Sequence, residues 1–179
     1  NSKNKLTRVF MQKQEEMVQR TIEKTVALLI AAAVMIVAMF FPAYKGEWGL
    51  LHLNASIAER GVWQFRHVNV FHAILNAWCL LAVTFNLHVT LRRMICLFAL
   101  CAACPYVKEG QYICGLSCFT IALTASNTFN VPNMRFFLFL LAATIASGFL
   151  FHSIAAYAHI YGAALGLIWG FANETLKEV

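Results

Sequence analysis

The 179-residue chain contains no aspartate, and its only acidic residues are eight glutamates. The glutamates lie near the chain ends or between apolar segments, at positions 15, 16, 23, 47, 59, 109, 174 and 178. Any catalysis inside an apolar segment must therefore proceed without a carboxylate. This absence excludes aspartyl proteases, which need two acidic side chains, and carboxylate-bridged metal sites.

Charged residues of either sign are also scarce. Only 12% of the residues are charged, 60% are hydrophobic, and the mean hydropathy is +0.65. A soluble domain carries about 25% charged residues. The composition therefore predicts an integral membrane protein in contact with the lipid bilayer, with room for one compact helical bundle and for no separate soluble domain.

Six apolar stretches divide the chain into an all-α, polytopic membrane protein with six transmembrane helices. The third and fourth are shorter than the roughly 20 residues that cross a bilayer at right angles. The predicted spans are Thr25–Tyr44, Asn69–Leu87, Met94–Tyr106, Cys114–Ala125, Met134–Phe151 and Ala156–Phe171. We expect a basic N-terminal segment at 1–24 that forms a surface helix, a membrane domain at 25–172 and a short tail at 173–179.

The net charge is +6, and the distribution of the lysines and arginines predicts the orientation of the spans. An even number of spans places both termini on one side, and that side receives most of the lysines and arginines. Because basic loops stay in the cytoplasm, both termini are expected there. The basic residues are spread over chain ends and loops, so we expect no nucleic-acid partner.

The six cysteines, at positions 79, 96, 101, 104, 114 and 118, fall mostly within apolar stretches. Their spacing is not typical of metal fingers or of secreted disulfide frameworks. We expect them to be small core side chains. Neither a metal site nor a cofactor is predicted.

Polar side chains interrupt three of the apolar segments. The first group is His67, His72 and Asn76 at the start of the second span. His72 and Asn76 are one helical turn apart and share a face, whereas His67 is about 140° away and is expected to tie down the preceding loop. Two interpretations of the pair remain: hydrogen bonds to neighbouring helices, or two donors directed at an oxyanion.

The second group is the sequence Gly115-Leu116-Ser117, which opens the fourth span after a polar loop. A serine at a helix start is often only a cap. Gly115, however, permits close approach of the backbone to a ligand, and a helix N-terminus offers free N–H groups where an oxyanion would form. Ser117 is therefore a candidate nucleophile.

The third group lies in the sixth span, where small residues recur every four positions at 158, 162, 166 and 170. Such a stripe, which includes Gly162 and Gly166, lets another helix approach closely. His159 borders this stripe. It is either a buried hydrogen-bonding histidine or a base held toward Ser117.

The three groups together resemble the rhomboid family of intramembrane serine proteases, over about Lys45 to Ala172. The resemblance rests on the H-x4-H-x3-N, the G-x-S and the A-H-x-x-G-x-x-x-G patterns in that order. It implies that Ser117 and His159 form a catalytic dyad, and that His72, Asn76 and the backbone N–H of Ser117 form the oxyanion hole. His67, Gly115, Gly162 and Gly166 would have supporting roles.

The family resemblance also implies an activity. The chain would be a serine endopeptidase of a bacterial inner membrane that cleaves transmembrane protein substrates in or near their helices. The connection between the first two spans would be half embedded, and the fifth span with residues 152–156 would control lateral access. Two positions differ from the family pattern: Cys118 replaces a glycine, and Ile121 replaces a tyrosine that packs on the histidine, for which Tyr157 or Tyr161 would compensate.

Three other functions fit parts of the pattern. A rhomboid-like pseudoprotease would bind membrane helices without cleaving them, but it has no need for both Ser117 and His159. A bis-histidine haem or metal protein would use two of His72, His88 and His159. A small transporter is disfavoured because the sequence shows no internal repeat.

Overall fold

The protein is helical in the part of the chain that the computed structural model describes, residues 2–44, 47–105, 107, 109–150 and 156–175. This part contains one short 3-10 helix and one isolated β-bridge, between Leu51 and Ile113, but no β-strand. The α-helices are α1 (Ser2–Phe40), α2 (Ile57–Val62), α3 (Val70–Asn86), α4 (Leu91–Ala102), α5 (Ser117–Ala125), α6 (Met134–Leu150) and α7 (Ala156–Thr175). The predicted all-α class is confirmed.

Each predicted span corresponds to one of the longer helices, while α2 lies in the connection between the first two. The boundaries of α4 and α5 also differ from the predicted ones, by three or four residues. The helix α4 ends at Ala102, earlier than expected, because Pro105 follows and disfavours helix before it. The helix α5 begins at Ser117 instead of Cys114, because Gly115 has a φ of 109°. Of the expected access loop at 152–156, residues 152–155 lie outside the described residues and Ala156 is the first residue of α7.

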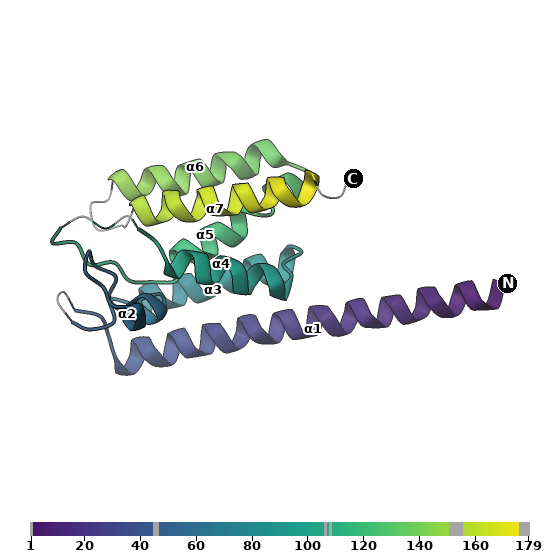
Figure 1. The fold of residues 1–179 in the computed structure, drawn as a ribbon, viewed down its shortest axis with the longest axis horizontal. Coiled ribbons are helices and arrows are strands. Elements are labelled where there is room, and N and C mark those ends of the chain that lie inside the picture. Colours follow the sequence, from purple (N-terminus) through teal and green to yellow (C-terminus); the bar gives the residue numbers. More distant parts are fainter. Residues whose placement is uncertain (1, 45–46, 106, 108, 151–155, 176–179) are drawn as a thin grey trace.

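The first helix is much longer than its predicted span. No glycine or proline interrupts residues 2–40, so α1 continues through the boundary expected between residues 24 and 25. Its 39 residues measure about 58 Å. All residues from Thr7 to Ile22 are exposed, and this part projects beyond the other helices (Figure 1). Pro42 follows the helix and prevents it from continuing.

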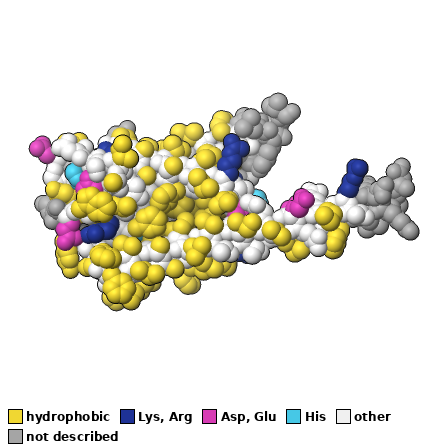
Figure 2. All heavy atoms as spheres, turned by 60° about the horizontal axis from the view of Figure 1, so that its bottom comes forward, with side chains coloured by type: hydrophobic (Ala, Val, Ile, Leu, Met, Phe, Trp, Pro, Cys, Tyr) yellow, Lys and Arg dark blue, Asp and Glu magenta, His cyan; other side chains and the backbone are white. Residues whose placement is uncertain are grey.

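One described helix, α1 between Thr7 and Phe40, is long and apolar enough to cross a membrane. Helix α3 is apolar but shorter, with 17 residues. Large hydrophobic side chains on the outside of the bundle are exposed, including Phe71 at 80% and Trp78 at 72%. On the face shown in Figure 2 hydrophobic side chains cover much of the bundle, and charged ones gather toward its ends and along the projecting part of α1. This distribution supports association with a membrane.

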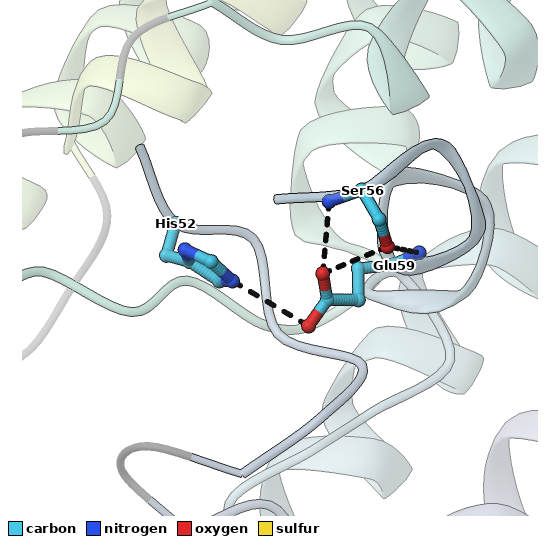
Figure 3. A network of polar contacts seen from close by, with 3 residues as sticks. All are labelled: His52, Ser56 and Glu59. Atoms are coloured by element: carbon cyan, nitrogen blue, oxygen red, sulfur yellow. Dashed lines mark hydrogen bonds and ion pairs between the residues drawn. The ribbon is translucent and has the colours of Figure 1, made fainter. Parts of the chain in front are cut away.

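The short helix α2 is fixed by a capping box (Figure 3). The backbone N–H and the hydroxyl of Ser56 each donate to Glu59 Oε2 at 2.8 Å, and the N–H of Glu59 donates to the Ser56 hydroxyl. The hydrogen bond from the Ser56 backbone N–H, and after it the bond from the Ser56 hydroxyl, hold the pKa of the Glu59 carboxyl below its usual range. His52 Nε2 lies 3.4 Å from the other oxygen of Glu59, so the cap also holds the preceding loop.

The connection that contains α2 is attached to the rest of the bundle. Trp63 and Gln64 are fully buried, and the side chain of Gln64 donates to the carbonyl of Phe98 in α4 at 3.2 Å. Leu51 pairs with Ile113 through two backbone bonds of 2.9 Å, just before α5. The loop therefore helps to position the segment that leads into Ser117.

A second polar cluster joins the helices at the opposite end of the bundle, where α4 begins and α5 ends. Glu23 of α1 is buried and accepts a hydrogen bond from the N–H of Leu91, the first residue of α4. Arg93 donates to the carbonyl of His88 at 3.1 Å and to the side chain of Asn127 at 3.0 Å. We call this end of the bundle, residues 87–91 and 126–133, the turn end. In Figure 1 the start of α1 and the end of α7 point in the direction of the turn end.

The cysteines differ partly from expectation. All six are free thiols, but only Cys101, Cys104 and Cys118 are buried. Cys79 is exposed and Cys96 and Cys114 are partly exposed. The prediction that all six are core side chains is therefore wrong for three of them, because their positions lie on helix or loop faces that the rest of the protein leaves wholly or partly uncovered.

Candidate active site

Ser117 is the first residue of α5, the most buried helix of the bundle. Leu116 occupies the N-cap position and has no side chain that can accept a hydrogen bond, so Ser117 is not the cap of this helix. Ser117 is partly exposed, whereas Cys118 and Phe119 after it are fully buried. The serine hydroxyl therefore lies at the accessible end of a helix whose remaining turns are enclosed by protein.

The hydroxyl of Ser117 lies 2.9 Å from Nε2 of His159. His159 is in the first turn of α7 and is buried, with 7% of its surface exposed. Among the described residues its other ring nitrogen, Nδ1, has no hydrogen-bond partner. The two side chains thus form a serine–histidine pair without an acidic third member, in a chain that contains no aspartate.

The distance between the two side chains depends on the contact between α5 and α7. A Cβ atom added to Gly162 would overlap the backbone carbonyl of Cys118, and one added to Gly166 would overlap the carbonyl of Ala122. The two helices therefore touch through their backbones. This is the close approach predicted from the stripe of small residues, and it places His159 one turn before the contact with Cys118.

Replacing Gly162 by alanine is expected to lower the free energy of unfolding by about 1 to 3 kcal/mol, because the new methyl group meets a carbonyl that cannot rotate away. Separation of α5 from α7 should also weaken the contact between Ser117 and His159. Thermal unfolding in detergent and fluorophosphonate labelling measure the two effects. Gly61→Ala in α2 is the matched control, because a Cβ there has no neighbour within 4 Å. Equal stability of both variants would contradict the proposed helix contact.

The backbone before Ser117 passes directly beneath His72 and Asn76. A Cβ on Gly115 would lie 2.8 Å from Cε1 of His72 and 3.6 Å from Nδ2 of Asn76. Gly115 also has a φ of 109°, a conformation that other residues rarely adopt. Its N–H donates to the carbonyl of Trp63 at 3.1 Å. Glycine is therefore required here by both the backbone conformation and the available space.

The side-chain donors of α3 face the same region. Asn76 uses one N–H to bond the carbonyl of His72 at 2.9 Å, which leaves its second N–H available. His72 is partly exposed, and its Nε2 is the ring nitrogen on the side of Gly115. Both side chains and the first turn of α5 therefore lie close to Gly115, the residue that begins the Gly115-Leu116-Ser117 sequence.

His67 connects the loop to the same backbone. Its Nε2 accepts a hydrogen bond from the N–H of Leu116 at 3.3 Å, so its Nδ1 carries the proton and donates to the carbonyl of Phe65 at 3.1 Å. His67 lies outside the helices and is fully buried, and burial lowers its pKa to about 4. It is therefore neutral near pH 7, as acceptance of the Leu116 N–H requires. His67 thus links the connection before α3 to the backbone before α5.

The two positions that differ from the family pattern pack as apolar side chains. Cys118 is fully buried, with its sulfur against Gly162. Ile121 belongs to a cluster with Ala125, Leu141 and Ala163. The hydroxyl of Tyr161 donates to the carbonyl of Leu100 at 3.1 Å and so links α7 to α4.

His88, the third histidine of the haem or metal hypothesis, lies far from His72. His72 is near the start of α3, and His88 follows its end, so the helix separates them by about 24 Å. Within the described residues no group of three or more His, Cys or Glu side chains is arranged to hold a metal ion.

No family model, curated protein or solved structure matches the chain.

Proposed function

We propose that the protein is a rhomboid-type intramembrane serine endopeptidase that cleaves transmembrane helices of other membrane proteins. The proposal rests mainly on the 2.9 Å contact between the Ser117 hydroxyl and Nε2 of His159. A serine hydroxyl is a weak nucleophile unless an adjacent base accepts its proton, and this contact supplies such a base. The ordered motifs of the sequence support the same assignment.

In the first half of the reaction, Oγ of Ser117 attacks the carbonyl carbon of the substrate peptide and its proton passes to Nε2 of His159. The carbonyl oxygen becomes an oxyanion, which accepts hydrogen bonds from His72, Asn76 and the N–H of Ser117. The C–N bond then breaks, and His159 returns the proton to the leaving amine. The products of this half are an acyl-enzyme on Ser117 and a free amine.

In the second half, His159 takes a proton from a water molecule while the water oxygen attacks the acyl carbon. The bond to Oγ of Ser117 breaks, and the proton returns to that oxygen. Ser117 and His72 are both partly exposed, and the proposal requires water to reach the dyad from this side. No cofactor or metal takes part in these steps.

The proposed placement in the membrane follows from the charge distribution. Six crossings by α1, α3, α4, α5, α6 and α7 put both termini in the cytoplasm of a bacterial cell. The dyad is then near the non-cytoplasmic surface, since α5 begins there. A substrate helix would be cut near its outer end, after its backbone has left the helical form and exposed a carbonyl to Ser117.

A fluorescent fluorophosphonate tests the proposal directly, because it reacts only with an activated serine. We expect purified protein in detergent to be labelled and Ser117→Ala to be unlabelled. Ser126→Ala is the matched control: Ser126 is a fully buried serine at the end of α5 whose hydroxyl bonds the carbonyl of Leu123. Labelling of this control should be unchanged. Folded wild-type protein that takes up no label would instead favour the pseudoprotease that binds helices without cleavage.

A further inference from the structure

Two basic side chains of α1 face the end of α3 at the turn end of the bundle. Nη2 of Arg20 lies 3.4 Å from Nδ1 of His88. The ammonium group of Lys24, one helical turn further along α1, lies 4.9 Å from the centre of the Phe85 ring. Two cations are therefore held side by side along the seam between α1 and α3.

Neither cation forms an ion pair with a carboxylate among the described residues. Within the described residues the ion pairs are those of His52 with Glu59 and of Arg66 with Glu47, far from this seam in the sequence. The intervening acidic residue, Glu23, is buried and accepts its hydrogen bonds from Gln19 and from the N–H of Leu91. A net positive charge therefore remains at the surface of the seam.

The cations stand at the boundary between the charged and the apolar parts of α1. Lys24 is the last charged residue before an uncharged run that continues to the end of the helix. Leu28, one turn further, and Phe85 of α3 are both exposed. A ligand that fits this surface has an anionic group next to an apolar chain.

We propose that Arg20 and Lys24, with Phe85 and His88, bind the phosphate headgroup of an anionic phospholipid. Its acyl chain would lie along the apolar surface that begins at Leu28 and Phe85. Basic sites between transmembrane helices on the cytoplasmic side favour such headgroups. The inference rests on the membrane placement in the proposed function, but not on catalysis, because the dyad lies at the other end of α3 and α5.

Titration of the detergent-purified protein with phosphatidylglycerol, followed by native mass spectrometry, tests this site. Each cation near the membrane surface contributes roughly fivefold to the affinity for an anionic lipid, so Arg20→Gln/Lys24→Gln should bind about 25-fold more weakly. Phosphatidylcholine, which carries no net charge, should bind weakly to both proteins. If the double variant is not monodisperse, each single variant should show a loss of about fivefold.

Arg8→Gln/Lys13→Gln is the matched control, with the same change in charge on the same helix. Lys13 and Arg8 are about 16 and 24 Å from Lys24 along α1, beyond the screening length of about 8 Å at physiological salt. The control should bind phosphatidylglycerol within about twofold of the wild type. Equal losses in both double variants would overturn the proposal, as would displacement of the lipid by millimolar inorganic phosphate, which indicates a site for free anions.

Fluorophosphonate labelling of the same samples separates this proposal from the proposed function. Labelling should be unchanged in both double variants, because they alter the end of the bundle opposite to Ser117. If the protein binds phosphatidylglycerol through Arg20 and Lys24 but takes up no label, the lipid site is supported and the proposed protease activity is contradicted. If the protein is labelled but its lipid binding does not depend on these two charges, the protease activity is supported and the lipid site is contradicted.

Discussion

Replacement of His159 by alanine is expected to reduce kcat/KM for a transmembrane substrate by at least about 10⁴-fold. The imidazole is the only group placed to accept the serine proton among the described residues, with Nε2 2.9 Å from the hydroxyl. Without it Ser117 remains protonated and the leaving amine receives no proton. Cleavage of a reporter helix in proteoliposomes measures the loss, and fluorophosphonate labelling should disappear in parallel.

Two further variants make this prediction specific. Ser117→Ala/His159→Ala should be no slower than either single variant, because the two side chains act as one unit. His52→Ala removes a histidine that bonds Glu59 in the loop and should leave kcat unchanged. Retained labelling of His159→Ala, or additive losses in the double variant, would mean that another group activates the serine.

The helices that correspond to the six predicted spans were predictable from the sequence because polar turns separate the apolar runs. The start of α5 was not, since an apolar run that includes Cys114 and Gly115 gives no sign of where helical geometry begins. The positive φ of Gly115 decides it. The length of α1 was also missed, because polarity changes near residue 24 while helix propensity does not.

The candidate site was predictable to the extent that its members recur at fixed spacing within single helices. His72 and Asn76 share a turn, and Gly162 and Gly166 share a stripe. The backbone hydrogen bonds between distant segments were not predictable. The carbonyl of Trp63 that holds Gly115 is a backbone atom in a distant loop, and backbone hydrogen bonds leave no mark on residue identity.

The turn end gives a second example of this limit. Glu23 appeared to be one of several charges in a basic surface segment. Instead it is buried against the start of α4, where a carboxylate interacts favourably with the free N–H groups of the helix. Such an interaction between elements far apart in the chain depends on the packing of α1, which periodicity alone does not specify.

Asn76→Ala is expected to reduce kcat by about 10² to 10³-fold with little change in KM, as for the loss of one donor of an oxyanion hole. The amide has one N–H bound to the carbonyl of His72 and a second N–H left for a ligand. The carbonyl oxygen of the substrate gains charge only as Ser117 attacks. The donor therefore stabilises the transition state more than the bound substrate, which is why kcat should respond rather than KM.

Asn86→Ala separates this effect from loss of helix stability. Asn86 lies at the other end of α3, and its Nδ2 donates to the carbonyl of Ala82 at 2.8 Å, in the same arrangement that Asn76 has with His72. Removal of either side chain deletes one such bond, but only Asn76 lies beside Gly115. A similar fall in kcat in both variants would show that Asn76 acts by stabilising α3. An unchanged kcat in Asn86→Ala would instead support a hydrogen bond from Asn76 to the oxyanion.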